Sequence, residues 1–251
     1  MRLDGRVAVV TGAGAGLGRA YALALARHGA HVAVQDIDAA GAEETRALIE
    51  ARGGEARAFA CDVADVATLA RRLNEVEGAL GRIDVLVNNA GVTEGPPTIE
   101  GVGEADFDRM FAVNVKGTFF ATRAVVPGMK RRRAGKIINV SSINAMIGDA
   151  IDSHYTGAKA AILGLTKAWA KELAPWGICV NAVAPGHVIT RATLGRGWAR
   201  IREVSETRIP MGRYAEPREI APAVVFLASP QSDFITGQVL SPNGGEAIVG
   251  F

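Results

Sequence analysis

Three polar residues have the types and spacing that suit proton transfer. Ser142 is followed thirteen positions later by Tyr155, and Lys159 comes four positions after that. Residues four apart on a helix lie on one face, so the ammonium group of Lys159 would lie beside the phenol of Tyr155. A neighbouring cation favours the phenolate and lowers a tyrosine pKa from about 10. Such a tyrosine can exchange a proton with an alcohol or a ketone near neutral pH.

A glycine-rich segment near the N-terminus predicts a binding site for a phosphate group. The apolar run Val7–Val10 leads into Gly12, Gly16 and Gly18, and a helical pattern follows. The spacing is G-x-x-x-G-x-G, whereas the usual dinucleotide fingerprint is G-x-G-x-x-G. Glycines permit a tight turn and let backbone N–H groups approach a phosphate, and the start of a helix supplies partial positive charge. A glycine-rich turn without a ligand is the alternative, which the position between a strand and a helix disfavours.

The residue that ends the second predicted strand indicates which dinucleotide binds. Asp36 lies eighteen residues beyond Gly18, where a carboxylate accepts hydrogen bonds from an adenosine ribose diol and repels a 2′-phosphate. The neighbouring side chains offer no cation for such a phosphate: Ala15, Gln35, Ile37 and Asp38. The alternative is that Asp36 only caps the helix from Ala39, but Asp38 is the better cap. We therefore predict NAD as the cofactor, with NADP less favoured.

Alternating strand and helix patterns must position these residues. Apolar runs typical of strands buried on both faces of a parallel sheet occur at Val7–Val10, His31–Val34, Arg57–Ala60, Ile83–Val87, Lys136–Val140, Ile178–Val183 and Gln238–Leu240. Helical periodicity covers Gly18–His28, Ala39–Arg52, Val66–Leu80, Ala105–Lys130, His154–Leu173 and Pro217–Leu227. Asp65 suits an N-cap, and Pro217 suits a first helical turn. This order predicts an α/β fold: one doubly wound, Rossmann-like domain over residues 1–251, with a parallel sheet of about seven strands and helices on both faces.

One segment, Arg191–Tyr214, does not follow the alternation. It contains Gly195, Gly197, Pro210 and Gly212 between charged residues. We expect a partly helical, mobile excursion at about residues 190–214, long enough to form a lid over a substrate.

Composition restricts the class of function. The 251 residues carry a formal net charge of +2 with both signs mixed along the chain, which gives no indication of a nucleic-acid or membrane partner. Cys61 and Cys179 lack metal-ligand spacing and are expected to be small buried side chains in a reducing compartment. The first residues do not read as a secretory signal, and no apolar run approaches the roughly 18 residues of a membrane span. We expect a soluble, cytoplasmic protein without a metal site.

Taken together, the motifs resemble those of the short-chain dehydrogenase/reductase family across nearly the whole chain. The matching residues, in the order and at the spacings of that family, are Thr11–Gly18, Asp62-Val63, Asn88–Gly91, Asn114, Ser142, Tyr155, Lys159, Pro185-Gly186 with Thr190, and Ile235–Gly237. The overall pattern is similar to that of bacterial members called 3-oxoacyl-acyl-carrier-protein reductase-like. The resemblance implies an oxidoreductase that transfers a hydride between NAD(H) and a secondary alcohol or ketone.

The resemblance also implies roles for individual residues. Tyr155 would be the general acid in reduction and the general base in oxidation, while Lys159 would lower its pKa and hold the nicotinamide ribose. Ser142 would hydrogen-bond the substrate oxygen, with Ser141 as the alternative serine. Asn114 would hold a water that links Lys159 to solvent, or would serve only in packing. The implied cofactor contacts are Gly12, Gly16, Leu17, Gly18, Asp36, Ile37, Asp62, Val63, Asn88, Asn89, Ala90, Gly91, Tyr155, Lys159, Pro185, Gly186, Val188 and Thr190.

Substrate contacts are expected after Ser142, around Tyr155 and in the excursion. The candidates are Ile143, Asn144, Met146, His154, His187, Val188, Leu194 and Trp198. Mostly apolar walls would fit a ketone or secondary alcohol of moderate size. His154 points about 100° away from Tyr155 on a helix, so we expect it at the surface or at an interface. Whether His187 reaches the cleft stays open.

Two other functions are alternatives. The run Lys130–Arg133 is either a solvated basic helix end or a dock for an acidic acyl-carrier protein, which would make the protein a 3-oxoacyl-thioester reductase. Trp176 weakens this alternative, because carrier-protein reductases of the family often have an arginine there. A non-catalytic dinucleotide-binding protein is the third possibility, which the intact catalytic residues disfavour.

The resemblance further implies a homotetramer that binds a small-molecule substrate. Subunits of the family associate through the helices at Ala105–Lys130 and His154–Leu173 and through the C-terminal strand. The apolar tail Ala247–Phe251 is expected to be buried against a neighbouring subunit.

Overall fold

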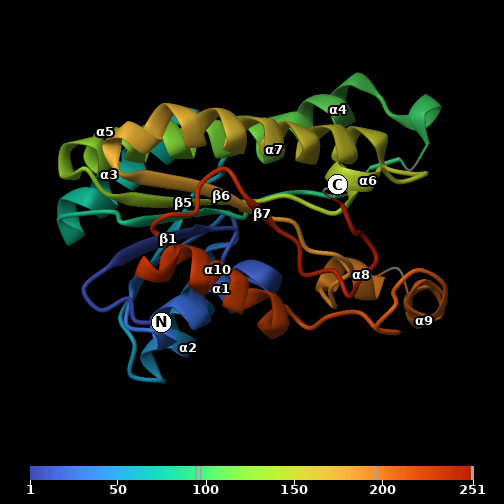
Figure 1. Ribbon diagram of the computed structural model, residues 1–251, viewed down its shortest axis with the longest axis horizontal. Helices are drawn as coiled ribbons and strands as arrows, with labels where there is room; N and C mark the ends of the chain where they lie inside the picture. The colour runs from blue at the N-terminus through green and yellow to red at the C-terminus, as the bar shows by residue number, and fades with distance from the viewer. Residues whose placement is uncertain (94, 97, 196, 250–251) are drawn as a thin grey trace.

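Seven parallel strands form the centre of the fold in the computed structural model, which describes residues 1–93, 95–96, 98–195 and 197–249 (Figure 1). Among these residues the strand order is β3-β2-β1-β4-β5-β6-β7. The strands are β1 (Val7–Thr11), β2 (His31–Asp36), β3 (Ala56–Ala60), β4 (Val85–Asn88), β5 (Gly135–Val140), β6 (Ile178–Val183) and β7 (Val239–Leu240). The order changes direction between β1 and β4, and ligands of such sheets bind beyond the carboxyl ends of the strands at this point.

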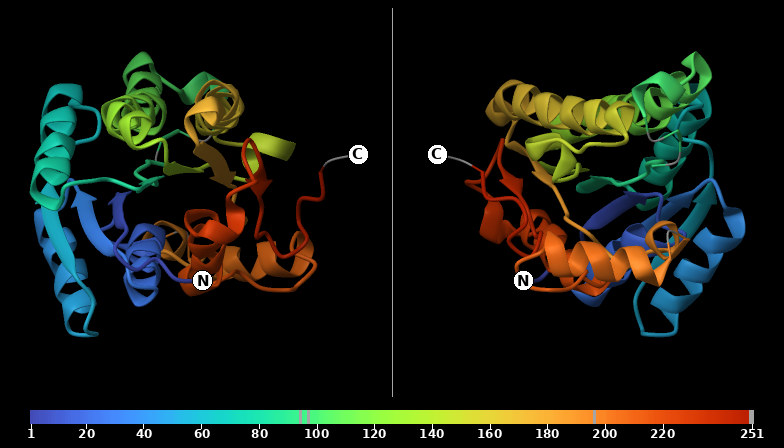
Figure 2. Two further views of the ribbon diagram at one scale, coloured as in Figure 1. Left: turned by 60° about the vertical axis from the view of Figure 1, so that its left-hand side comes forward. Right: turned by 90° about the vertical axis from the view of Figure 1, so that its right-hand side faces the viewer.

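Helices cover both faces of the sheet (Figures 1 and 2). On one face α1 (Gly16–Arg27), α2 (Ala39–Glu50) and α10 (Pro217–Ala228) bury side chains such as Leu25 and Val224. On the other face α3 (Val66–Leu80), α5 (Thr118–Arg132) and α7 (Ser153–Leu173) bury side chains such as Leu73, Val125 and Leu173. The predicted doubly wound α/β domain is therefore confirmed.

Local sequence signals account for several of the helix boundaries. The Asp65 side chain accepts a hydrogen bond from Thr68 N at 3.1 Å at the start of α3. Asp38 accepts one from Ala40 N at 3.1 Å at the start of α2, so Asp38 and not Asp36 caps this helix. Pro217 opens α10, where it loses no helical hydrogen bond.

The long helix predicted over Ala105–Lys130 is wrong in its middle. The structure has α4 (Glu104–Phe111), then a π-helical segment at Ala112–Gly117, and then α5. The Asn114 side chain donates to the Met110 carbonyl at 3.0 Å, the carbonyl that would accept the Asn114 N–H in an α-helix. Wide turns of this kind occur often at functional sites.

The expected excursion is partly helical, as predicted. It contains α8 (Arg191–Gly195) and α9 (Trp198–Thr207). A further short helix outside the excursion, α6 (Asn144–Ile147), packs against α7. Buried side chains of Ile201, Val204, Ile209 and Tyr214 form a small separate core. Its action as a lid stays a prediction.

The C-terminal tail is only partly described. Ala247 is buried, whereas Ile248 is 84 % and Val249 is 51 % exposed. Gly250 and Phe251, on which part of the tail prediction falls, lie outside the described residues. Within the described ranges, no helix combines the length and the apolar character needed to cross a membrane.

Candidate active site

A cavity of about 610 Å³ lies beyond the carboxyl ends of the strands. It is lined by every residue predicted to be catalytic and by every predicted cofactor contact except Gly16 and Asn88. Gly16 is the first residue of α1, with a φ of 54°. Asn88 is buried and donates to Thr122 and Asn139 instead. One cavity therefore brings together residues from position 12 to position 190.

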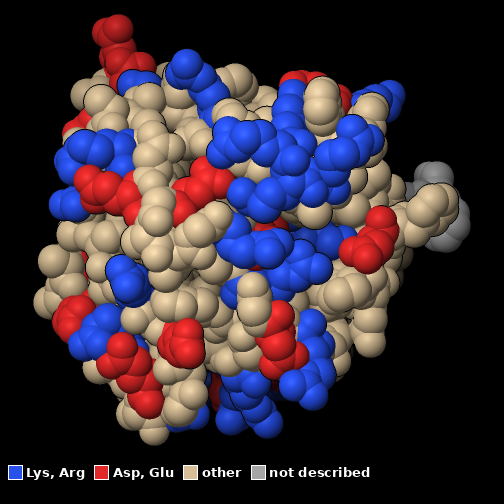
Figure 3. Space-filling model, turned by 90° about the vertical axis from the view of Figure 1, so that its left-hand side faces the viewer, with Lys and Arg blue, Asp and Glu red and all other residues tan. Residues whose placement is uncertain are grey.

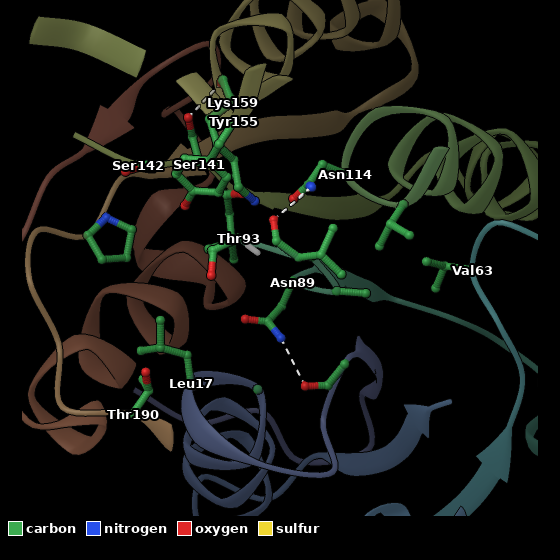
Figure 4. Close-up of a pocket in the computed structure, with 18 of the residues that line it drawn as sticks. Leu17, Val63, Asn89, Thr93, Asn114, Ser141, Ser142, Tyr155, Lys159 and Thr190 are labelled. Carbon is green, nitrogen blue, oxygen red and sulfur yellow. Dashed lines mark hydrogen bonds between the residues drawn. The ribbon is translucent and has the colours of Figure 1, made fainter. Parts of the chain in front are cut away.

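Ser142, Tyr155 and Lys159 lie together on one side of this cavity (Figure 4). Ser142 directly follows β5, and the other two residues lie on α7. The Lys159 Nζ atom is 5.7 Å from the centre of the Tyr155 ring, as the spacing of four predicts. The Ser142 hydroxyl accepts a hydrogen bond from Asn144 N at 3.2 Å. Ser141 donates its proton to the Lys159 carbonyl at 2.8 Å, which favours Ser142 as the serine available to a ligand.

Lys159 is a buried cation. Its ammonium donates to the Val140 carbonyl at 3.0 Å, and its residue is only 5 % exposed. Burial lowers the pKa of Lys159 from 10.5 to about 8, because desolvation disfavours the charged form. The group therefore holds its proton weakly enough to release it near neutral pH.

Asn114 approaches Lys159 from the opposite side of the cavity (Figure 4). Its amide nitrogen donates to the Val92 and Met110 carbonyls, each at 3.0 Å. Its oxygen Oδ1 is buried and has no hydrogen-bond partner among the described residues. A Cβ atom on Gly91 would lie 2.6 Å from this oxygen and 3.2 Å from Lys159 Nζ. Gly91 thus leaves room for Asn114 and Lys159 to face a common space.

The glycine turn after β1 is tightly packed against the segment that follows β4. A Cβ atom on Gly12 would lie 2.8 Å from Ala90 Cα, and one on Gly18 would overlap the Gly12 carbonyl oxygen. Asn89 Nδ2 donates to the Thr11 and Gly12 carbonyls at 2.8 and 3.0 Å. These contacts fix the backbone of the turn at the start of α1.

The start of α1 fits a phosphate. The N-cap residue Ala15 provides no capping side chain, and the first turn contains no acidic residue. The N–H groups of this turn therefore point outward without a side-chain acceptor, together with the positive end of the helix dipole. Leu17, the second residue of α1, lines the cavity at this helix end, and Thr190 lies near it (Figure 4). The arrangement fits the pyrophosphate of a dinucleotide.

Asp36 and Asp62 lie at the end of the cavity formed by β2 and β3. The Asp36 carboxylate accepts from Gly14 N at 2.7 Å and from Asp38 N at 3.0 Å. Asp62 accepts from Ala64 N at 2.8 Å. These backbone donors hold both carboxylates in fixed orientations, and the exposed Ile37 also lines this part of the cavity. Carboxylates at this end could accept hydrogen bonds from the hydroxyls of a bound adenosine.

The substrate candidates separate into two groups. Ile143, Asn144, His187 and Val188 line the cavity, which answers the open question about His187. The others are not among the lining residues: Met146, His154, Leu194 and Trp198. His154 is only 5 % exposed and packs against Gly95, so the expectation of a surface position is wrong, and the alternative of an interface position stays a prediction. A helical direction alone does not show which loop covers it.

The lining of the cavity is mostly apolar, as expected, but it contains carboxylates that were not predicted. Asp149 and Asp152, which precede Tyr155, line the cavity together with Thr93 and Thr193. Gln35, whose side chain connects Gly12 N to the Cys61 carbonyl, lines it at the other end. The available signal was the pair of acidic residues Asp149 and Asp152, since both lie between Ser142 and Tyr155. That these side chains point toward the cavity could not be predicted, because the irregular segment that carries them has no repeating sequence pattern.

Known proteins with similar sequences and structures support a redox enzyme. The family model described as enoyl-(acyl carrier protein) reductase matches residues 12–246. The 3-oxoacyl-[acyl-carrier-protein] reductase FabG of Thermotoga maritima is 40 % identical over 99 % of this chain and 100 % of its own. A 7α-hydroxysteroid dehydrogenase, solved with NADH and 7-oxoglycochenodeoxycholic acid, is 35 % identical over 97 % of this chain and 95 % of its own, with a TM-score of 0.92.

A second solved structure contains the other nicotinamide cofactor. It is a Beutenbergia cavernae protein assigned as an NAD(P)-dependent gluconate 5-dehydrogenase, with bound NADP at low occupancy. This protein is 38 % identical over 98 % of both chains, with a TM-score of 0.91. The similarity extends over almost the full length of each of these proteins, and the motifs of the cavity lie within it. The chain therefore belongs to the short-chain dehydrogenase/reductase family of oxidoreductases.

Proposed function

We propose that the protein oxidises a secondary alcohol with NAD⁺, or reduces the corresponding ketone with NADH. The observation that carries this proposal is the common cavity, in which Ser142, Tyr155 and the buried Lys159 face one end and Asp36 faces the other. Bound NAD⁺ would accept the hydride that leaves the carbinol carbon. The hydroxyl proton of the alcohol passes to the phenolate of Tyr155 as the C–H bond breaks, and the C=O bond of the ketone forms.

The roles of the four residues follow from their surroundings. Tyr155 exchanges the proton, and Ser142 donates to the substrate oxygen, where negative charge develops. Lys159, with its pKa lowered to about 8 by burial, favours the phenolate and can pass a proton on. Asn114 Oδ1, buried and without a partner among the described residues, provides an acceptor on the route from Lys159 toward solvent.

The first experiment tests Tyr155. Replacing Tyr155 with phenylalanine removes only the hydroxyl, so turnover should fall by roughly 10³-fold or more while the Kd for NADH changes less than about threefold. Turnover is measured by absorbance at 340 nm and NADH binding by fluorescence titration. Turnover that survives the substitution would exclude Tyr155 as the acid/base.

The preference for NAD over NADP is the second part of the proposal. Asp36 is held toward the glycine turn by Gly14 N, and a 2′-phosphate there would meet its charge. The nearest cation on α1, Arg19, is engaged by Glu44 at 2.6 Å and by the Thr45 hydroxyl at 3.0 Å. Asp36→Ala should therefore lower the ratio of kcat/KM for NAD to that for NADP. A wild-type enzyme that prefers NADPH would contradict this part.

Reduction of a 3-oxoacyl thioester is a second candidate function. Relatives with that name support it, and so does a basic surface on the side of the molecule where α5 ends (Figure 3). On that surface the cationic groups of Lys130 and Arg133 lie 5.2 and 5.8 Å from the centre of the Trp176 ring. These cation–π contacts compete with binding of an acidic partner by the same two groups. A panel of 3-oxoacyl thioesters against simple ketones at 340 nm separates the two functions.

We further propose that the protein is a cytoplasmic homotetramer. An apolar groove along α4, α5 and α7 is lined by Phe111, Phe119, Phe120 and Leu165, and Phe119 is 39 % exposed. A second subunit would cover these rings. Both cysteines are free, which suits a reducing compartment. Light scattering tests the assembly, and a monomer would contradict it.

A further inference from the structure

A chain of polar contacts extends along the substrate end of the cavity. The segment from Asn144 to Asp152 connects Ser142 to Tyr155, so its lining side chains lie at the reacting end and away from Asp36. Asn144 Nδ2 donates to Asp149 Oδ2 at 3.3 Å, and Asp149 lies 3.8 Å from an Arg208 nitrogen. Asn144 and Asp149 both line the cavity. A substrate bound next to Ser142 would therefore meet an amide and a carboxylate.

His187 belongs to the same chain of contacts and lines the cavity from another segment. Its ring stacks on Tyr214 with centres 4.9 Å apart. Its Nε2 lies 3.3 Å from Glu246, and the other Glu246 oxygen lies 2.9 Å from Arg208 Nε. A carboxylate behind an imidazole orients the ring and polarises it toward a ligand. Burial lowers the pKa of His187, which favours the neutral imidazole, and a neutral ring keeps one nitrogen as an acceptor.

The Glu246 carboxylate is buried, although most acidic side chains are exposed. Its side chain is 4 % exposed, and neither oxygen has an aligned hydrogen bond among the described residues. A buried carboxylate costs free energy unless nearby charges compensate it. Here the compensating charge is that of Arg208, 2.9 Å from one Glu246 oxygen, and the His187 ring lies 3.3 Å from the other. This placement makes Glu246 a positioning residue for the histidine.

We propose that the substrate is a polyhydroxylated secondary alcohol or its keto form, and that His187, Asp149 and Asn144 bind the hydroxyl groups beside the one that reacts. The proposal rests on the proposed dehydrogenase function and adds the substrate class. A site built from hydrogen-bonding groups rejects an analogue that lacks the matching hydroxyl by factors up to about 10⁴, because its own polar groups are then left unpaired. A mono-alcohol or a plain acyl chain would leave the remaining hydrogen-bonding capacity of these three side chains without a ligand partner.

The test compares alcohols of matched shape. Initial rates with NAD⁺ are measured for cyclohexanol against myo-inositol and for hexan-3-ol against sorbitol. The polyol of at least one pair should have the higher kcat/KM, by roughly 100-fold. Equal values, or faster oxidation of both mono-alcohols, would overturn the proposal while leaving the dehydrogenase function intact. Absence of NAD-dependent turnover with every alcohol would instead count against the dehydrogenase function.

Two variants locate the recognition. His187→Phe keeps an aromatic ring against Tyr214 and removes hydrogen bonding, so the polyol preference should fall at least tenfold while kcat/KM for the mono-alcohol changes less than threefold, on the order expected for one lost hydrogen bond. Glu246→Gln should raise KM for the polyol with little change in kcat. Trp198→Ala, at an exposed side chain that does not line the cavity, is the control and should leave the preference unchanged. An unchanged preference in His187→Phe would refute the role of His187.

A binding measurement makes the proposal independent of turnover. In Tyr155→Phe loaded with NADH, calorimetry should show tighter binding of a polyol than of its mono-alcohol partner. The additional substitution His187→Phe should remove the difference. Equal binding of both ligands by the NADH-loaded protein would overturn the substrate class even where no catalysis is seen.

Discussion

Replacing Lys159 with methionine should make the cofactor-free protein more stable relative to wild type at pH 7 than at pH 9.5. Burial lowers the pKa of Lys159 from 10.5 to about 8. Between these pH values the unfolded chain binds a proton that the folded protein does not. The stability of the wild type therefore rises with pH across this interval, and the methionine variant lacks that rise.

The size of the effect follows from the same shift. A difference of roughly 2.5 pKa units corresponds to a cost of about 3 kcal/mol for keeping the ammonium buried at pH 7. At pH 9.5 most of this cost has disappeared, and about 1.4 kcal/mol remains. The stability difference between variant and wild type should therefore shrink by about 2 kcal/mol from pH 7 to pH 9.5. The lost hydrogen bond to the Val140 carbonyl contributes equally at both pH values and cancels.

Urea unfolding of both proteins at the two pH values provides the measurement, with slopes compared to confirm that the same surface is exposed. The comparison also cancels Cys61, whose pKa is raised to about 11 by burial and which reduces stability at high pH in both proteins. Lys167→Met, at an exposed position of the same helix, is the matched control. A difference that does not change with pH would show that Lys159 is not desolvated. The same variant should lose turnover, because the proposed proton route passes through Lys159.

Three further predictions concern other parts of the molecule. Gly91→Ala should lower kcat at least about tenfold, because its methyl group would lie 2.6 Å from Asn114 Oδ1; steady-state kinetics test this, and an unchanged kcat would contradict it. Asp38→Ala should lower the free energy of unfolding by about 1 kcal/mol through loss of the cap, measured by urea unfolding, without changing the cofactor preference. Cys179 should react with Ellman's reagent faster than Cys61, which is buried and has a raised pKa; a Cys61→Ser variant that loses the faster phase would reverse this assignment.

The sequence predicted the fold because its signals are local and repeated. The β6 and α3 boundaries agree with the structure to the residue, since apolar runs and caps act within a few positions. The spacing of Tyr155 and Lys159 likewise depends only on the geometry of one helix. The break at Ala112–Gly117 escaped prediction, because it reflects one side chain, Asn114, competing for a carbonyl. Helical periodicity does not contain that information.

The substrate end of the cavity could not be predicted from the sequence for a different physical reason. Asp149 before α7 and His187 after β6 line it, and Glu246 near the C-terminus contacts His187. No two of these residues belong to one repeating element. Each carboxylate alone would be read as a surface charge. Only the packing of three distant segments shows that Glu246 is buried behind a histidine that lines the cavity.

This division between local and distant residues bears on how the family varies. The residues placed near the proton transfer, Ser142, Tyr155 and Lys159, are held by one strand end and one helix, so the sheet topology positions them with little help from loops. Of the residues proposed to select the substrate, Asp149, His187 and Glu246 lie outside the helices and strands, where insertions and substitutions cost little stability, and Asn144 begins the short α6. A change at His187 or Glu246 can therefore alter the alcohol that binds without moving the hydroxyl of Tyr155. These positions should therefore determine the substrate class. A relative with the same residues at the positions of Asn144, Asp149, His187 and Glu246 should share the preference for hydroxylated substrates.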